Sequence, residues 1–464
     1  MRESRDLGDI EQSCYWLANR SLAPAPPLEG RREADIVIVG AGFTGLWSSL
    51  FLKEQDPKLE ILVLEQGVAA YGASGRNAGQ LGESIDHSSR LVVRHFDRGE
   101  AERMVRVGKQ NLEELLRFLD ERGIDCDLER TGMMFVALTP VHLEHLRAEA
   151  QGARRLGMTH LRLLDGAQVR AEIHCDHYLG ALLNPHGCVL NPVKLADGLK
   201  RESERQGTRF FERTRVVAVE PSGGGVRVRT DAGEVLARKA VLATNAYTHQ
   251  LMPRLGRHFL PLYDYILVSE PLTQAQHEAI GWSGRQGAGD MRSFFNYYRL
   301  TADNRILWGG SEALYHRGNR VDPDCDHSPR HYAALRQSFR WHFPALRDLE
   351  FPYAWGGPIC ATTRFSPFFG TLQGGRIVYG LGYTGHGVGN TRFGGQILAH
   401  LALERRSPLL DLRIVRRKPF PYPPEPLRSL AVRAVTRALQ RVDAGGKPGL
   451  LLRGLDALGI GFSS

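Results

Sequence analysis

A glycine-rich turn between a strand and a helix is the feature that most constrains how this chain folds. Residues 34–39 are apolar and β-branched, which predicts a buried strand of a parallel sheet. The run GAGFTG, residues 40–45, follows at once, and residues 46–52 have the pattern of a helix. A second strand, over residues 59–64, ends at Glu65. This order predicts a βαβ unit that binds a dinucleotide.

Each part of the unit has a physical role in holding a dinucleotide. Gly40 permits a tight turn, Gly42 lets the backbone approach a pyrophosphate, and Gly45 lets the helix pack closely on the strand. The first turn of the helix offers unpaired N–H groups and the positive end of its dipole to phosphate. Glu65 is expected to accept hydrogen bonds from ribose hydroxyls, and its charge argues against the 2′-phosphate of NADP.

A second glycine-rich loop favours FAD over NAD. Residues 72–81 read GASGRNAGQL, in which Ser74 and Arg76 supply a hydroxyl and a guanidinium for phosphate and the glycines keep the backbone close to a flat ring system. With this loop the chain resembles flavoenzymes of the D-amino-acid oxidase superfamily, which includes glycine oxidase and sarcosine oxidase. The block ASGRNAGQ is most similar to the γ-glutamylputrescine oxidase and aminophosphonate oxidoreductase branches.

A third glycine-rich loop follows a strand near the C-terminus. Residues 375–381 have the pattern of a strand, residues 382–389 read GYTGHGVG, and residues 390–403 have the pattern of a helix. In the superfamily that the chain resembles, the N-terminus of this helix points at the pyrimidine edge of the flavin, where it stabilises negative charge on the reduced ring. The resemblance also places the Val217 backbone against adenine and the strand that ends at Asn245 beside the dinucleotide.

The resemblance implies the fold class and the cofactor. It implies an α/β chain, α+β overall, with a Rossmann-like FAD-binding domain and a substrate domain whose sheet is mostly antiparallel. FAD is expected to bind without a covalent bond. The FAD-binding domain is expected over residues 30–90, 160–250 and 352–425, the substrate domain over 91–159 and 251–351, and a basic helical extension over 426–464. The residues expected to contact FAD are Gly40, Gly42, Phe43, Thr44, Gly45, Glu65, Gln66, Ser74, Gly75, Arg76, Asn77, Ala78, Gly79, Gln80, Leu81, Val217, Ala243, Asn245, Gly382, Gly385, His386, Gly387 and Val388.

The resemblance also implies the reaction. In the superfamily, the C–H bond next to an amine is oxidised, a hydride passes to the flavin, the imine is hydrolysed to an aldehyde or ketone, and O2 (giving H2O2) or another acceptor reoxidises the flavin. Because the cofactor carries this chemistry, no protein base is required. Desolvation in an aromatic pocket lowers the pKa of the amine. The expected substrate is a small amine with an anionic end, such as an aminoalkylphosphonate or γ-glutamylputrescine. The alternatives are an amino acid of glycine, sarcosine or proline type and, outside enzymes, a flavin-bearing binding protein.

The candidate catalytic and substrate residues lie in strands and loops around the expected pocket. The run Tyr297-Tyr298-Arg299, followed by Trp308-Gly309-Gly310, resembles a block in γ-glutamylputrescine oxidases. Strand alternation lets either Tyr298 or Arg299 face the substrate, but not both. A buried arginine would bind a carboxylate or phosphonate through two hydrogen bonds. The catalytic candidates are Tyr298, Arg299, His386 and Gln80, and the substrate candidates are Tyr263, Tyr265, His316 and Arg317.

Cysteine usage bounds the metal and redox chemistry. The six cysteines are scattered without a C-x-x-C pair, so neither a metal site nor a disulfide framework is expected. The expected compartment is the reducing cytoplasm. Cys360 lies in a segment comparable with the one that holds flavin covalently in some sarcosine oxidases. Its neighbours depart from that pattern, which favours a buried structural cysteine.

The formal charge of +9 raises the question of an anionic partner. Residues 427–442 have the pattern of an amphipathic helix with Arg433, Arg437 and Arg441 on one face. A basic amphipathic helix is typical of a contact with a membrane surface or a nucleic acid. The aromatic residues that stack on bases in nucleic-acid-binding proteins do not accompany it. A solvated helix that covers a domain, or an oligomer contact, is the favoured interpretation, and no nucleic-acid partner is expected. No apolar run reaches the ~20 residues that span a bilayer.

Overall fold

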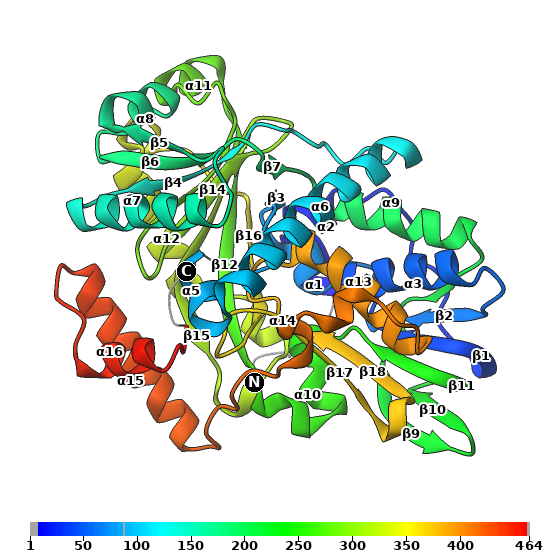
Figure 1. The fold of residues 1–464 in the computed structure, drawn as a ribbon. Coiled ribbons are helices and arrows are strands. Elements are labelled where there is room, and N and C mark those ends of the chain that lie inside the picture. The colour runs from blue at the N-terminus through cyan, green and yellow to red at the C-terminus, as the bar shows by residue number, and fades with distance from the viewer. Residues whose placement is uncertain (1–7, 87–88, 462–464) are drawn as a thin grey trace.

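The computed structural model describes residues 8–86 and 89–461 and contains two large β-sheets (Figure 1). The first sheet has the order β17-β18-β11-β1-β2-β8, and a hairpin of β9 and β10 extends from β11. Strand β1 pairs in parallel with both β2 and β11. The strands of this sheet are β1 (Gly30–Val39), β2 (Ile61–Leu64), β8 (Arg209–Phe211), β9 (Val216–Ser222), β10 (Gly225–Thr230), β11 (Gly233–Leu242), β17 (Phe368–Leu372) and β18 (Ile377–Leu381).

The second half of β1, residues 36–39, is buried on both faces, which explains the unbroken apolar sequence there. Ile36 and Ile38 face a core shared with helices α3 (Phe43–Gln55), α6 (Arg98–Arg122), α9 (Pro192–Arg205) and α13 (Gly387–Ala402). Val37 and Val39 face a second core, shared with β10, β11 and β18. The order β1, α3, β2 is the predicted βαβ unit.

The second sheet has the order β16-β12-β15-β14-β13-β4-β6-β5. Its neighbours pair antiparallel except β13 and β4, which are parallel, so the expectation of a mostly antiparallel sheet is confirmed. Helix α12 (Pro329–His342) packs on one face, over an aromatic core. The strands are β4 (Met133–Ala137), β5 (Arg162–Asp165), β6 (Gly180–Asn184), β12 (Leu260–Pro271), β13 (Gly287–Asp290), β14 (Asn296–Leu300), β15 (Arg305–Tyr315) and β16 (Tyr353–Ala361).

Three strands that the sequence assigned to the FAD-binding domain belong to the second sheet. Strands β5 and β6, within residues 160–250, pair with each other and with β4, and β16, within residues 352–425, pairs with β12. These parts of the predicted boundaries are wrong, because an apolar strand pattern does not reveal which strand will be its partner. The remaining domain division stays a prediction.

A helical hairpin follows the last strand. Helices α15 (Leu427–Asp443) and α16 (Leu450–Ala457) contact each other, and Leu439 and Leu452 are buried (Figure 1). Across the described part of the chain, no helix combines the length and apolar character needed to cross a bilayer. The other elements are the two-stranded sheet of β3 (Gln80–Leu81) and β7 (Cys188–Val189) and helices α1 (Gly8–Ser13), α2 (Tyr15–Ala18), α4 (Ala73–Arg76), α5 (Ser89–His95), α7 (Pro140–Arg155), α8 (Gly166–Glu172), α10 (Thr248–Leu251), α11 (Gln274–Ile280) and α14 (Arg413–Arg416).

Candidate active site

A cavity of about 1860 Å³ connects the glycine loops, the second sheet and the C-terminal hairpin. Gly40 and Glu65 line it on the first sheet, Asp264 and Tyr297 on the second, and Leu439 on the hairpin. A pocket for one drug-sized ligand is ~300–1,000 Å³. The cavity therefore has room for a dinucleotide cofactor together with a substrate.

The glycine turn forms a cradle that side chains would fill. A Cβ on Gly40 would lie 2.9 Å from the Ala243 carbonyl oxygen, and one on Gly45 would lie 2.0 Å from the Gly40 carbonyl oxygen. The first backbone N–H of α3, at Phe43, donates to Ser74 Oγ at 2.9 Å. This places a hydroxyl at the N-terminus of a helix, where anions bind.

Glu65 stands at the end of β2 and borders the cavity. Its carboxylate accepts hydrogen bonds from the Ala41 N–H at 2.8 Å and the Gly67 N–H at 3.0 Å. Burial raises the pKa of Glu65 to about 7, and these two bonds oppose the rise. Further donors, such as the ribose hydroxyls of a dinucleotide, would stabilise the ionised form.

Arg76, which is predicted to bind phosphate, makes several contacts within the protein, while its Nη2 has no hydrogen-bond partner among the described residues. Its Nη1 forms an ion pair with Asp326 at 2.8 Å and donates to the Gly356 carbonyl oxygen at 3.2 Å, and its Nε donates to the Tyr71 carbonyl oxygen. The charge of Arg76 is thus balanced within the protein. The side chain borders the cavity while it ties the second glycine loop to β16.

Helix α13 points its N-terminus at the cavity, as the resemblance implies. Gly385, His386, Gly387 and Val388 line the cavity where the helix begins. Burial lowers the pKa of His386, which favours a neutral imidazole at pH 7. The unpaired N–H groups of this helix therefore form a second positive end beside the same cavity.

Not every residue expected to contact FAD borders the cavity. Val217 is 43 % exposed, and its neighbour Val216 lines the cavity instead, because successive strand residues point to opposite faces. Gly45, Gly75, Gly79, Leu81 and Gly382 also lie outside the cavity wall. The residues of the prediction that do line it are Gly40, Gly42, Phe43, Thr44, Glu65, Gln66, Ser74, Arg76, Asn77, Ala78, Gln80, Ala243, Asn245, Gly385, His386, Gly387 and Val388.

On β12 the residue between the two predicted tyrosines faces the cavity. Asp264 lines the cavity, whereas Tyr263 and Tyr265 lie in the aromatic core on the other face of the sheet, under α12. The Tyr265 hydroxyl donates to the Cys325 carbonyl oxygen. The structure contradicts the prediction that these tyrosines face the cavity. They point to the face that α12 covers, and Asp264, which lies between them, points to the cavity.

The same shift occurs on β14, where Tyr297 lines the cavity and Tyr298 does not. The Tyr297 hydroxyl donates to Asp264 Oδ2 at 2.5 Å. Its ring crosses Gly309 of the intervening strand β15, where a Cβ would lie 2.3 Å from the ring. Gly309 therefore makes room for the hydrogen bond between β14 and β12.

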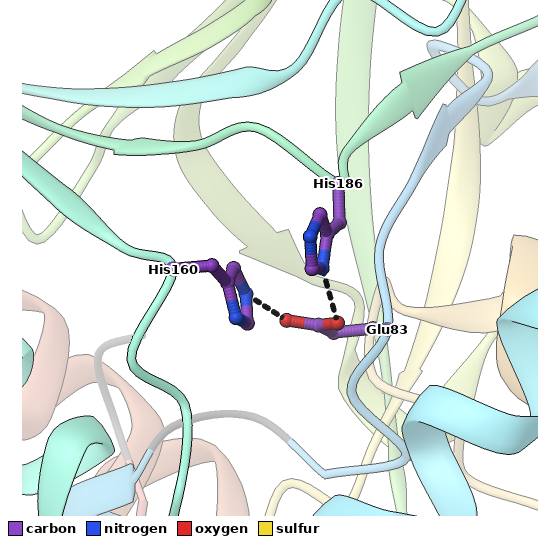
Figure 2. Close-up of side chains that lie close together, drawn as sticks. All are labelled: Glu83, His160 and His186. Carbon is purple, nitrogen blue, oxygen red and sulfur yellow. Dashed lines mark hydrogen bonds and ion pairs between the residues drawn. The ribbon is translucent and has the colours of Figure 1, made fainter.

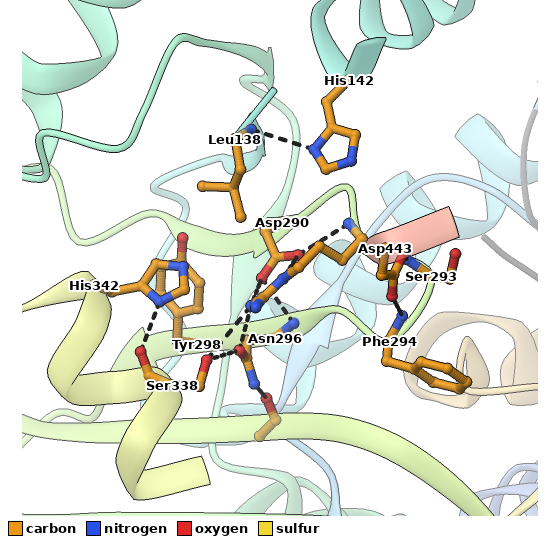
Figure 3. Close-up of polar contacts among 12 residues, drawn as sticks. Leu138, His142, Asp290, Ser293, Phe294, Asn296, Tyr298, Ser338, His342 and Asp443 are labelled. Atoms are coloured by element: carbon orange, nitrogen blue, oxygen red, sulfur yellow. Dashed lines mark hydrogen bonds and ion pairs between the residues drawn. The ribbon is translucent and has the colours of Figure 1, made fainter. Parts of the chain in front are cut away.

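Tyr298 lies behind the sheet, beside His342 and the polar network around Asp290 (Figure 3). Its hydroxyl hydrogen-bonds to that of Tyr178, and its ring packs on Trp308. His342 lies nearby and binds the Ser338 carbonyl oxygen through Nδ1, and burial lowers the pKa of His342 to about 4. These contacts give Tyr298 a structural place away from the cavity.

The predicted anion-binding residues also lie elsewhere. Arg299 donates from Nη1 to the Leu190 carbonyl oxygen at 2.7 Å and from Nε to the Leu300 carbonyl oxygen, and burial lowers its pKa to about 10. It fixes the backbone beside the second glycine loop rather than a substrate. His316 and Arg317 are not part of the cavity wall, and Arg317 is exposed. Gln80, in contrast, borders the cavity and donates to the Ala288 and Tyr298 carbonyl oxygens.

Comparison with known proteins decides what the cradle holds. The family model described as "FAD dependent oxidoreductase" matches residues 35–401. The chain belongs to this family of FAD-dependent oxidoreductases. γ-Glutamylputrescine oxidoreductase of Escherichia coli K12 is 32% identical over 391 residues, covering 84% of this chain and 88% of that protein. A probable oxidoreductase, OrdL, of Haemophilus influenzae is 28% identical over 398 residues, with the same two coverages.

Solved structures of other enzymes have the same fold. Glycine oxidase from Geobacillus kaustophilus superposes with a TM-score of 0.69 at 19% identity, covering 83% of this chain and 99% of that chain. L-proline dehydrogenase from P. horikoshii gives 0.68 at 17% identity, covering 84% and 98%. The sequence-based expectations of the fold class, of FAD and of an enzyme that oxidises an amine are confirmed at the level of the family.

The cradle of this flavoenzyme fits FAD. Ser74 and the α3 N-terminus suit the pyrophosphate, Glu65 suits the ribose, and the α13 N-terminus suits an electron-rich ring edge. Cys360 borders the cavity and is buried, and burial raises the pKa of its thiol well above the usual value. A protonated thiol is a poor nucleophile, which supports the non-covalent attachment that stays a prediction.

The C-terminal hairpin covers the cavity of the flavoenzyme. This agrees with the interpretation of residues 427–442 as a helix that covers a domain. Val432, Val435 and Leu439 of α15 line the cavity, whereas Arg433, Arg437 and Arg441 are exposed. The Asp443 carboxylate accepts hydrogen bonds from the Ser293 N–H at 2.8 Å and the Phe294 N–H at 3.0 Å (Figure 3). The apolar face of the basic helix is thus part of the active-site wall, which its arginine pattern alone did not reveal.

Replacing Asp443 with alanine should loosen the hairpin. Two backbone N–H groups lose a charged acceptor, and each such bond contributes ~1.5–3 kcal/mol. We expect faster proteolytic cleavage within the hairpin, residues 427–457, and a higher KM for the amine. Arg437→Ala, on the exposed face of the same helix, is the matched control and should leave the rate of cleavage and the KM unchanged. Equal cleavage of the two variants would contradict this role of Asp443.

Proposed function

We propose that the protein oxidises an extended amine with an acidic tail, of the γ-glutamylputrescine type. The observation that carries the proposal is the pair of Tyr297 and Asp264, which faces the same cavity as the FAD cradle. A half-buried carboxylate on the cavity wall suits the cationic nitrogen of such a substrate. The name of the 32% identical relative from Escherichia coli supports the substrate class.

Bound FAD would supply the acceptor for a hydride from the carbon next to the amine nitrogen. The task of the protein is to hold the amine and to remove its extra proton. Burial raises the pKa of Asp264 to about 6, while the hydrogen bonds from Tyr297 and from the Tyr265 N–H at 2.8 Å oppose the rise. At neutral pH Asp264 is therefore an anion that binds the substrate ammonium and accepts a proton from its nitrogen at a carboxylate oxygen. The Tyr297 hydroxyl holds that carboxylate in place.

The outer part of the cavity supplies positive charge for the tail of the substrate. Arg98 and Arg155 border the cavity and are exposed to solvent, and Arg98 Nε also forms an ion pair with Glu102 at 2.8 Å. They lie on α6 and α7, on different elements from the strands that carry Asp264 and Tyr297. An extended substrate would place its amine at Asp264 and its carboxylate toward these arginines. An α-amino acid carries its carboxylate next to the amine, and the candidate partner Arg299 is engaged with backbone carbonyl groups outside the cavity wall.

An anaerobic reduction screen tests the proposal. The yellow protein is mixed with γ-glutamylputrescine, putrescine, 2-aminoethylphosphonate, glycine, sarcosine or proline, and bleaching of the flavin band is followed. We expect γ-glutamylputrescine to reduce the flavin fastest. Faster bleaching by an amino acid would assign the protein to amino-acid oxidation, and bleaching by no amine would make it a flavin-bearing binding protein. Repeating the reaction with O2, and assaying H2O2, separates an oxidase from a dehydrogenase.

A further inference from the structure

Three side chains from distant segments converge at one edge of the cavity (Figure 2). Glu83 follows β3 and borders the cavity. His160 lies in the connection between α7 and β5, and His186 lies in the turn between β6 and β7. One ligand atom from each of the three lies within 4.8 Å of the others.

The three side chains point toward a common centre. His160 Nε2 is 2.5 Å from Glu83 Oε1, and His186 Nδ1 is 3.1 Å from Glu83 Oε2. The two imidazole rings stack with their centroids 3.9 Å apart and their planes 16° apart. The two ring nitrogens thus reach the two oxygens of one carboxylate, so three atoms of types that bind transition metals lie together.

Hydrogen bonding does not satisfy this cluster fully. Glu83 is 7 % exposed, yet Glu83 Oε1 and His160 Nε2 are buried without a hydrogen-bond partner of suitable geometry among the described residues. Their close approach lacks the alignment of a donor with an acceptor. Buried polar atoms whose hydrogen-bonding geometry is poor destabilise a fold unless another partner reaches them. A cation bound at ~2.0–2.2 Å from each atom would satisfy both at once, once the two side chains move slightly apart.

The backbone holds two of the ligands before any ion binds. A Cβ on Gly108 of α6 would lie 2.1 Å from the Glu83 carbonyl oxygen, so the Glu83 backbone packs directly on this helix. The His186 N–H donates to Asn184 Oδ1 at 3.0 Å, which fixes the turn that carries His186. Ligands held in this way lose little freedom on binding a metal.

We propose that Glu83, His160 and His186 bind one divalent transition-metal ion of the zinc class. Two imidazole nitrogens and a carboxylate oxygen suit Zn²⁺, and three protein ligands leave a fourth position for water. The ion fastens together the loop after β3, the link after α7 and the β6–β7 turn, and so stiffens this edge of the cavity. The expectation of no metal rested on the absence of a local motif, and these ligands lie too far apart in the sequence to form one.

Zinc titration of the untagged, FAD-loaded protein tests the site. After treatment with a chelator, the protein is titrated with Zn²⁺ by calorimetry, and one ion per chain is expected. Glu83→Gln, His160→Ala and His186→Ala should each weaken binding by at least ~100-fold, since even partners of ligands contribute ~10–100-fold. His277→Ala, on α11, is the matched control and should bind as the unaltered protein does.

Copper spectroscopy gives an independent measure of the ligands. Electron paramagnetic resonance of the Cu²⁺-loaded, unaltered protein should report two imidazole nitrogens. His160→Ala and His186→Ala should each report one nitrogen, and Glu83→Gln should still report two. Flavin absorbance and thermal unfolding without metal establish that each variant is folded. The proposal is overturned if no ion binds to the unaltered protein, or if binding and the nitrogen count are the same in all variants.

Discussion

Replacing Gly45 with valine should yield a protein that no longer retains FAD. A Cβ at this position would lie 2.0 Å from the Gly40 carbonyl oxygen and 3.3 Å from the Ile38 side chain, so the turn and α3 must move apart. The α3 N-terminus would then leave its place beside Ser74. We expect FAD affinity to fall by about 100-fold or more, which corresponds to ~2.8 kcal/mol. The ratio of flavin absorbance to protein after gel filtration measures the loss.

Gly224 provides the control for this substitution. It lies in the turn between β9 and β10, and a Cβ there would meet no atom within 4 Å. Gly224→Ala should therefore remain yellow. Thermal unfolding in excess FAD separates a folded but empty Gly45→Val protein from an unfolded one. If Gly45→Val binds FAD as tightly as the unaltered protein does, the glycine turn is not the pyrophosphate site.

Replacing Asp264 with asparagine should lower kcat/KM for the amine by about 100-fold, the lower end of the ~10²–10⁴-fold that a positioned proton acceptor contributes. Burial raises the pKa of Asp264 from 3.8 to about 6, so the carboxylate exists above about pH 6 and is lost as the pH falls through that value. The unaltered enzyme should therefore gain kcat/KM as the pH rises through about 6. Asp264→Asn should lack this rise, as initial rates measured across pH 5–8 would show.

Two neighbouring tyrosines provide a matched pair for the same experiment. The hydrogen bond from Tyr297 lowers the pKa of Asp264, so Tyr297→Phe should shift the rise in kcat/KM to higher pH. Tyr298→Phe removes a hydroxyl from the opposite face of the strand, where it meets Tyr178, and should leave the pH dependence in place. An unchanged pH dependence in Asp264→Asn would remove Asp264 from the proton transfer.

The parts of the fold that were predictable from sequence are those with local signals. The glycine turn at residues 40–45 needs a strand before it and a helix after it, and all three are adjacent in the chain. The same is true of the loop before α13. Which face of a strand meets the cavity is not local. Tyr298 and Tyr297 differ by one position, and the choice between them depends on α12, which covers the other face.

Charged residues were the least predictable part of the site. Arg76 and Arg299 have the residue type that binds phosphate or carboxylate, yet Asp326 and several carbonyl oxygens engage them in the folded chain. Asp264 was missed because it stands between two more conspicuous tyrosines. Its partner across β15 becomes visible only when the register of β12, β15 and β14 is known.

The position of the C-terminal hairpin in the chain has a consequence for biosynthesis. Helices α15 and α16 follow every strand of both sheets, yet they line the cavity that these strands form. The ribosome therefore synthesises the residues of the cofactor cradle before those of the hairpin that covers it. FAD is able to enter the nascent chain before the hairpin is made. Once the hairpin docks, FAD and substrate share a covered chamber, so the lifetime of the bound cofactor is set partly by a segment made after the cradle.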